Sequence, residues 1–184
     1  MGKIVLVTGG ARSGKSSFAE KYIKEHGHAI AYIATAQILD EEMQQRINEH
    51  QKRRSSDWHT AEAPFEAEIA INACQKYDAI LFDCLTVYMS NIICLPQMEK
   101  LEANKIEDEI LSAVKKLAEA AAAHKGITVF VTNEVGSGIV PENKLARQYR
   151  DIAGKCNQYM AQNADEVYFV VSGIPIKIKD TLIK

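Results

Sequence analysis

The segment that most constrains the fold lies near the start of the chain, where an apolar run is followed at once by a glycine-rich stretch. Residues 9–16 read Gly-Gly-Ala-Arg-Ser-Gly-Lys-Ser and match G-x-x-x-x-G-K-[ST] at every specified position. A turn of this kind between a buried strand and a helix leaves successive backbone N–H groups free to bind phosphate oxygens. The sequence therefore predicts a nucleoside triphosphate site, with Lys15 on the β- and γ-phosphates and Ser16 on Mg²⁺. The alternative is an ordinary glycine-rich turn without a ligand.

Length and charge set the outer limits of this hypothesis. A chain of 184 residues is expected to form one domain, 1–184, with one substantial core. Its 22 basic and 24 acidic residues are intermixed and give a net charge of −2, so nothing in the charge favours nucleic acid or a membrane surface as partner. Apolar stretches are no longer than a strand, and the first residues lack the apolar core of a signal peptide. We expect a soluble cytoplasmic protein without a membrane span.

Apolar runs alternate with helical patterns along the chain. Near-continuous apolar segments predict strands over 3–8, 29–34, 79–83, 128–132 and 166–171, as in a parallel sheet covered on both faces. Helices are predicted over 16–25 and 99–124. Residues 172–175 resemble a hairpin turn into an antiparallel edge strand over 174–178, where a proline is tolerated. The predicted fold is a three-layer α/β domain of the P-loop NTPase (RecA-like) class, with a mostly parallel sheet and an antiparallel C-terminal edge strand.

An acidic residue is expected at the end of a second buried strand, because Mg²⁺ beside the loop serine needs a carboxylate. Asp83 ends the apolar run 79–83 and is our candidate, so Ser16 and Asp83 form the predicted metal site. The competing interpretation is that Asp83 caps a helix that follows it.

Residues 40–58 are unusual because their helical pattern contains only Met43 and Ile47 as apolar anchors. His50 falls on the same face, with Arg46, Arg53 and Arg54 about one turn away. Neighbouring guanidinium groups disfavour protonation, so His50 can present a neutral ring nitrogen, as a nucleophile toward phosphorus requires. On composition alone, a solvated charged helix remains the simpler interpretation.

Several segments together resemble one enzyme family, the bifunctional adenosylcobinamide kinase/adenosylcobinamide-phosphate guanylyltransferases of cobalamin biosynthesis. The resemblance covers residues 3 to about 179. It rests on segments 8–16, 32–35 and 40–43, on Arg46, Ile47, His50, Arg54 and Trp58, on segments 132–136 and 138–141, and on Arg150, Asp151, Gly154, Asn157 and Gln158.

The resemblance implies two reactions at one nucleotide site. Adenosylcobinamide is phosphorylated by ATP or GTP, and GMP is then transferred from GTP to adenosylcobinamide phosphate through a guanylylated histidine, with release of pyrophosphate. It places that catalytic histidine at His50, beside the catalytic Lys15, and it implies a homotrimer. The nucleotide-binding residues predicted from motif and resemblance together are Thr8, Gly9, Gly10, Ala11, Arg12, Ser13, Gly14, Lys15, Ser16, Ile33, Ala34, Thr35, Gln51, Lys52, Arg53, Arg54, Glu62 and Asp83.

The segment 133–141 is rich in glycine and follows a predicted buried strand. Without the resemblance, the segment is as compatible with an ordinary strand-to-helix connection as with a mobile loop close to a ligand. With the resemblance, we expect it to contact the corrinoid, with Glu134 as a candidate proton acceptor in the kinase reaction. Two other classes of function remain: a small-molecule kinase without transferase activity, in which His50 is a surface residue, and a regulatory nucleotide-binding module.

Overall fold

The computed structural model describes residues 2–38, 41, 44, 45, 48 and 57–180. Its elements are, in chain order, β1 (Lys3–Gly9), α1 (Lys15–His26), β2 (Ile30–Ala34), β3 (His59–Glu62), α3 (Ala67–Ala73), β4 (Ala79–Asp83), α4 (Leu85–Ile93), the 3₁₀ helix η1 (Met98–Lys100), α5 (Ala103–Ala123), β5 (Ile127–Asn133), α6 (Lys144–Asn163), β6 (Glu166–Val171) and β7 (Ile174–Asp180).

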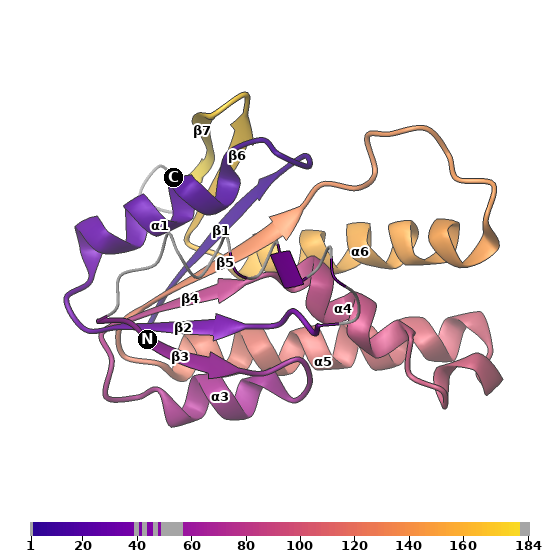
Figure 1. Ribbon diagram of the computed structural model, residues 1–184, viewed down its shortest axis with the longest axis horizontal. Helices are drawn as coiled ribbons and strands as arrows, with labels where there is room; N and C mark the ends of the chain where they lie inside the picture. Colours follow the sequence, from indigo (N-terminus) through magenta and orange to yellow (C-terminus); the bar gives the residue numbers. More distant parts are fainter. Residues whose placement is uncertain (1, 39–40, 42–43, 46–47, 49–56, 181–184) are drawn as a thin grey trace.

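The strands form one seven-stranded sheet in the order β3-β2-β4-β5-β1-β6-β7 (Figure 1). All neighbouring pairs are parallel except β6 and β7, which are antiparallel. The predicted mostly parallel sheet with an antiparallel C-terminal edge strand is thus confirmed. Ser172 and Gly173 form the two-residue turn between the last strands and both have positive φ, 50° and 81°, as a type I′ turn requires.

The structure differs from the sequence prediction at one strand and at the start of one helix. The edge strand β3 was not predicted, because its sequence His-Thr-Ala-Glu has no apolar run and three of its residues are exposed. The helix predicted over 99–124 is α5, which begins only at Ala103, after η1 and a break at Leu101. Neither difference changes the layering.

The sheet is covered on both faces, which gives the predicted three layers (Figure 1). Alternate side chains of β1 serve the two faces: Val5 and Val7 pack with α1, while Ile4 and Leu6 pack against the layer that contains α3, α5 and α6. None of the helices in the described part of the chain is long and apolar enough to cross a membrane.

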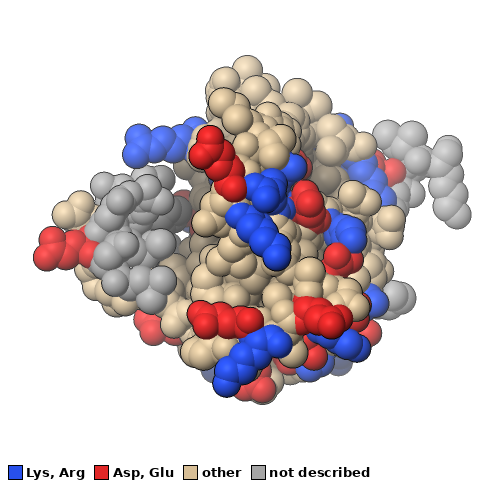
Figure 2. Space-filling model, turned by 90° about the vertical axis from the view of Figure 1, so that its right-hand side faces the viewer, with Lys and Arg blue, Asp and Glu red and all other residues tan. Residues whose placement is uncertain are grey.

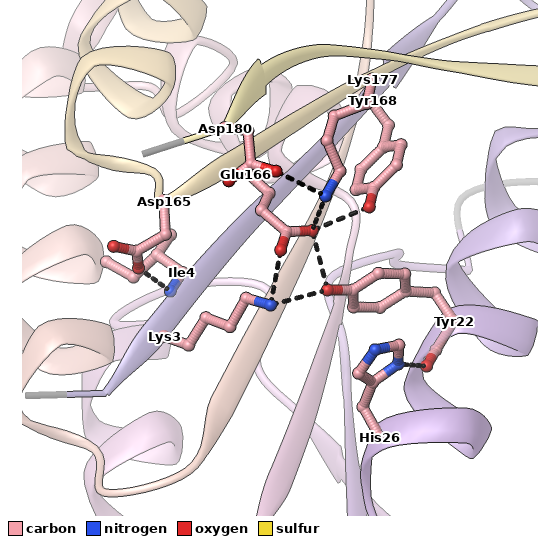
Figure 3. Close-up of polar contacts among 9 residues, drawn as sticks. All are labelled: Lys3, Ile4, Tyr22, His26, Asp165, Glu166, Tyr168, Lys177 and Asp180. Atoms are coloured by element: carbon pink, nitrogen blue, oxygen red, sulfur yellow. Dashed lines mark hydrogen bonds and ion pairs between the residues drawn. The ribbon is translucent and has the colours of Figure 1, made fainter. Parts of the chain in front are cut away.

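A buried polar cluster ties α1 to the strands at the amino-terminal edge of the sheet (Figure 3). Its centre is the Glu166 carboxylate, only 6% exposed, which pairs with Lys3 at 2.6 Å and Lys177 at 3.3 Å. The hydroxyls of Tyr22 and Tyr168 donate to the same carboxylate at 3.0 and 2.8 Å. This cluster lies at the first residues of β1 and β6, so it is at the opposite edge from the glycine-rich loop.

The strand register brings the remaining polar segments to the carboxyl-terminal edge. Ala34 of β2 pairs with Glu62 of β3 on one side and with Asp83 of β4 on the other. On β1, Gly9 pairs with Asn133, the last residue of β5. In a parallel sheet this edge is where ligands bind.

Candidate active site

The glycine-rich loop connects β1 to the first turn of α1, as the motif predicts. Gly14 stands directly before the helix with φ of 93°, a conformation that a residue with a Cβ rarely adopts, and Arg12 has φ of 56°. Lys15 is the first residue of α1 and is only 9% exposed. Its Nζ donates to the carbonyl of Gly10 at 3.1 Å, so the lysine folds back over the loop.

Lys15 lies in the electrostatic field of two residues at the end of β4, which is separated from β1 by β5 in the sheet. Burial lowers the pKa of Lys15, and Cys84 and Asp83 partly oppose this effect. The charge of Asp83 thus acts on Lys15, although the two residues follow different strands.

Two buried hydroxyls at the loop have no hydrogen-bond partner among the described residues. They are Thr8 Oγ1, at the end of β1, and Ser13 Oγ, inside the loop. Buried polar atoms are nearly always satisfied, so an unpaired pair in a loop of this kind fits a site that takes a polar ligand.

Asp83 is half-buried and accepts a hydrogen bond from the hydroxyl of the buried Tyr32 at 2.9 Å. It does not cap the following helix. The N-cap residue of α4 is Cys84, whose Sγ accepts from the backbone N–H of Val87 at 3.5 Å. Burial, and then the charge of Asp83, raise the pKa of the Cys84 thiol to about 11. The capping interpretation of Asp83 is therefore wrong.

The end of β2 lies next to Asp83 but is more deeply buried than the site prediction implies. Ile33 and Thr35 are both fully buried. Thr35 Oγ1 donates to the carbonyl of Cys84 at 3.0 Å and accepts from its N–H at 2.9 Å. In this structure both residues support the sheet edge, whereas Ala34 is half-buried and Glu62 is exposed.

Asn91 reinforces the same edge and was not predicted from the sequence. Its Nδ2 donates to the carbonyl of Thr35 at 2.8 Å and to that of Pro64 at 3.1 Å. An isolated asparagine within an apolar helix gives no local signal of this role.

The remaining predicted site residues, His50, Gln51, Lys52, Arg53 and Arg54, lie outside the described residues. In the part of the chain that the structure describes, no three His, Cys, Asp or Glu side chains gather as a metal site. A Mg²⁺ ion held by one hydroxyl, one carboxylate and substrate phosphates does not need such a group.

The loop between β5 and α6 arches away from this edge of the sheet (Figure 1). The N–H of Glu134 donates to the carbonyl of Gly9 at 3.0 Å, so the loop starts beside the glycine-rich loop. At its far end, Arg147 Nη1 donates to the carbonyls of Pro141 and Glu142 at 2.9 and 2.6 Å.

Between these anchors the loop carries an apolar tip. Ile139 is 96% exposed and Val140 is 58% exposed. Figure 2 shows this side of the molecule, where basic and acidic side chains lie next to one another among uncharged residues. The exposed apolar tip can contact the apolar surface of a large ligand.

Comparisons with known proteins identify the family. The model of the family described as cobinamide kinase / cobinamide phosphate guanyltransferase matches residues 5–178. This chain belongs to that family. Members named bifunctional adenosylcobalamin biosynthesis protein CobU are 45% identical in Salmonella typhimurium and 41% identical in Escherichia coli, each over 96% of this chain and 99% of the relative. The Pseudomonas aeruginosa member, named bifunctional adenosylcobalamin biosynthesis protein CobP, is 37% identical over 95% of this chain and 96% of its own length.

Among solved structures, the family fold is similar to that of an ATPase of the type III secretion system of pathogenic bacteria. The TM-score is 0.57 at 14% identity, over 92% of this chain and 51% of that chain. At this level of identity the likeness concerns the fold alone, and it confirms the predicted P-loop architecture.

Proposed function

We propose that this chain, as one domain, phosphorylates adenosylcobinamide and then transfers GMP to the phosphate it has made. The observation that carries the proposal is a complete G-x-x-x-x-G-K-[ST] loop between β1 and α1, in a chain that matches the kinase and guanyltransferase family over residues 5–178. We place the reactions in the cytoplasm, where GTP and ATP are supplied.

In the kinase reaction, the aminopropanol hydroxyl oxygen of the corrinoid forms a bond to the γ-phosphorus. The bond from that phosphorus to the β–γ bridging oxygen breaks, and the nucleoside diphosphate leaves. Lys15 offsets the charge that gathers on the phosphate oxygens, and the backbone N–H groups of residues 10–15 orient them. Glu134, at the start of the 134–141 loop, accepts the hydroxyl proton.

In the transferase reaction, a ring nitrogen of His50 attacks the α-phosphorus of GTP, and pyrophosphate leaves. A phosphate oxygen of the corrinoid then attacks the same phosphorus, and the phosphorus–nitrogen bond breaks. Two displacements let the bulky acceptor enter after pyrophosphate has departed. We assign Gln51, Lys52, Arg53, Arg54 and Glu62 to the guanine nucleotide, and we place the nucleotide beside Ala34.

A magnesium ion is part of this proposal. Ser16 and Asp83 provide the hydroxyl and carboxylate oxygens that such an ion prefers, and the partly buried carboxylate of Asp83 next to Lys15 fits a site of high charge density. When bound, the ion would neutralise phosphate charge; Ser16 and Asp83 would hold it.

We propose that the corrinoid binds under the 134–141 loop, against the exposed side chains of Ile139 and Val140. We also propose a homotrimer, in which the exposed Ile174, Ile176 and Ile178 of β7 offer apolar surface for subunit contact. Light scattering of the purified protein tests the trimer directly, and a monomeric mass would contradict it.

Labelled nucleotide tests the central proposal. Incubation with α-labelled GTP should leave an acid-labile label on the protein, and γ-labelled GTP or ATP should transfer its label to adenosylcobinamide. Transfer of the γ-label without any protein-bound α-label would identify a small-molecule kinase instead. Hydrolysis without either transfer would identify a regulatory nucleotide-binding module.

A further inference from the structure

The 134–141 loop leaves the sheet at Asn133. The backbone N–H and carbonyl of Asn133 are each bound by a side chain from a different helix. Its N–H donates to Thr86 Oγ1 of α4 at 2.7 Å. Its carbonyl accepts from Nδ2 of Asn157, on α6, at 3.1 Å. Thr132 completes the ring: its Oγ1 donates to Asn157 Oδ1 at 2.8 Å and lies 3.3 Å from Thr86 Oγ1.

The protons in this ring can be arranged in one way only. Thr132 has a single hydroxyl proton, which goes to Asn157, so the bond between the two threonines must be donated by Thr86. The Asn133 carbonyl can only accept, which fixes the orientation of the Asn157 amide. Every donor and acceptor then points the same way around the ring, an arrangement in which successive hydrogen bonds strengthen one another.

The ring is buried and braced. Thr86 is 5% exposed and Thr132 is fully buried, so a broken bond there is not replaced by water without cost. The hydroxyl of Tyr149, also on α6, donates to the backbone carbonyl of Thr86 at 2.7 Å. These contacts lock α4, β5 and α6 together at one point.

That point sets the direction of the loop. The next N–H along the chain, that of Glu134, bonds to Gly9 at the entrance of the phosphate-binding loop. We infer that Asn157 is a positioning residue for the acceptor substrate: through Thr132 and Asn133 it aims the 134–141 loop and its apolar tip at the corrinoid. This inference rests on the proposed function. No member of the ring lies in the glycine-rich loop, so changes in the ring should affect binding of the corrinoid and not the reaction of GTP with the protein.

Asn157→Leu removes the ring's amide while keeping the size of the side chain. The KM for adenosylcobinamide should rise about tenfold, as expected for the loss of a buried hydrogen bond at each end of the amide. The kcat of the kinase reaction should fall by a smaller factor, because Glu134 adjoins Asn133. Formation of the α-labelled protein from GTP without corrinoid should keep its wild-type rate. Asn163→Leu is the matched control, because Asn163 lies on the same helix and its Nδ2 donates to a backbone carbonyl, that of Tyr159, at an exposed position.

Further variants separate positioning from a general loss of stability. Thr86→Ser keeps the hydroxyl and should retain the wild-type KM, whereas Thr86→Val keeps the shape, removes the acceptor for Asn133 and should raise the KM. Asn157→Asp can still accept from Thr132 but directs an oxygen at the Asn133 carbonyl, so it should behave like Asn157→Leu.

Hydrogen exchange of the peptide that contains residues 134–141 provides a readout independent of activity, and this exchange should be faster in Asn157→Leu than in the Asn163→Leu control. Unchanged exchange and an unchanged corrinoid KM in folded Asn157→Leu and Thr86→Val would overturn the inference. A parallel loss of GTP labelling would overturn it as well. If the wild-type protein neither labels nor phosphorylates, the proposed function fails, and the exchange comparison still decides whether Asn157 positions the loop.

Discussion

The backbone N–H of Gly173 donates a hydrogen bond to the carbonyl of Ser13 at 2.8 Å. The turn between β6 and β7 thereby supports the phosphate-binding loop from the side, and a Cβ on Gly14 would come within 3.0 Å of the Gly173 Cα. The turn between the last two strands thus contacts the glycine-rich loop directly, although the two segments lie at opposite ends of the sequence.

Gly173→Ala tests this support. The position has φ of 81°, so alanine is strained there by about 1 kcal/mol even though no atom lies within 4 Å of the new Cβ. The dissociation constant for GTP should rise about fivefold as the turn shifts away from Ser13. Calorimetric titration measures it. Gly154→Ala is the control: Gly154 is within α6 and has free space, so alanine should raise the free energy of unfolding by about 0.5–1 kcal/mol and leave GTP binding unchanged.

Lys15→Ala should lower both half-reactions by about a thousandfold or more, because one lysine offsets phosphate charge whether the γ-phosphoryl group or pyrophosphate departs. Rates of corrinoid phosphorylation and of protein labelling measure the two effects. Lys21→Ala, on the same helix but in an exposed pair with Glu25 at 3.9 Å, should change neither rate. Normal guanylyl transfer in folded Lys15→Ala protein would refute the single-site model.

Asp83→Asn should raise the Mg²⁺ concentration needed for half-maximal turnover and lower the maximal rate. The free energy of unfolding should remain nearly unchanged, since an asparagine oxygen can still accept from Tyr32 and the helix cap is supplied by Cys84. A Mg²⁺ titration of the rate, combined with urea denaturation without nucleotide, separates the two quantities. Normal Mg²⁺ dependence in a destabilised variant would assign Asp83 a purely structural role.

His50→Asn keeps size and polarity but removes the nitrogen that forms the phosphoramidate. Guanylyl transfer should fall by several orders of magnitude and no α-label should remain on the protein, while kinase activity persists. Mass spectrometry of the GTP-treated wild-type protein should locate the adduct on the peptide that contains His50. An adduct on His59 instead would contradict the assignment.

The Glu166 cluster makes the free energy of unfolding depend on pH in the acidic range. Burial raises the pKa of this carboxyl group, but hydrogen bonds from Lys3, Tyr168, Tyr22 and Lys177 outweigh burial and lower the pKa to about 2, from an ordinary 4.5. Folding therefore favours the charged form. The resulting stabilisation is complete at pH values above the ordinary pKa of 4.5 and is lost as the pH falls toward about 2.

Urea denaturation at a series of pH values measures this effect. Between the two pKa values the wild-type protein should lose roughly 2 kcal/mol more stability than Glu166→Gln, after allowance for the partial exposure of both lysines. Glu107→Gln serves as the comparison, because its pair with Lys155 at 2.5 Å is more exposed and should contribute little. Parallel curves for wild type and Glu166→Gln would contradict the expected role.

Much of this fold follows from local sequence. The strand over Ala79–Asp83 and the strand over Glu166–Val171 have the predicted bounds, because buried parallel strands appear as uninterrupted apolar runs. The strand over His59–Glu62 was not predicted, since it pairs with β2 at the edge of the sheet and nothing in four mostly exposed residues reports that pairing.

The candidate site was likewise predicted only in part from the sequence. Lys15 and Asp83 were predicted because each follows a buried strand in a recognisable pattern. The ring of Thr86, Thr132 and Asn157 was not predicted, since its members lie on three elements and meet only once the chain is folded. The burial of Thr35 was also missed, because a polar residue at a strand end is as compatible with ligand contact as with a bond to a neighbouring backbone.

The 134–141 loop is held by hydrogen bonds at its two ends. The ring around Asn133 binds its start, and Arg147 donates to the carbonyls of Pro141 and Glu142 at its end. The segment between those anchors can therefore diverge in length and composition while the phosphate-binding machinery stays intact. For protein engineering, this makes residues 135–140 a replaceable segment: a graft that keeps Glu134 and both anchor points is expected to change the acceptor alcohol without redesign of the glycine-rich loop.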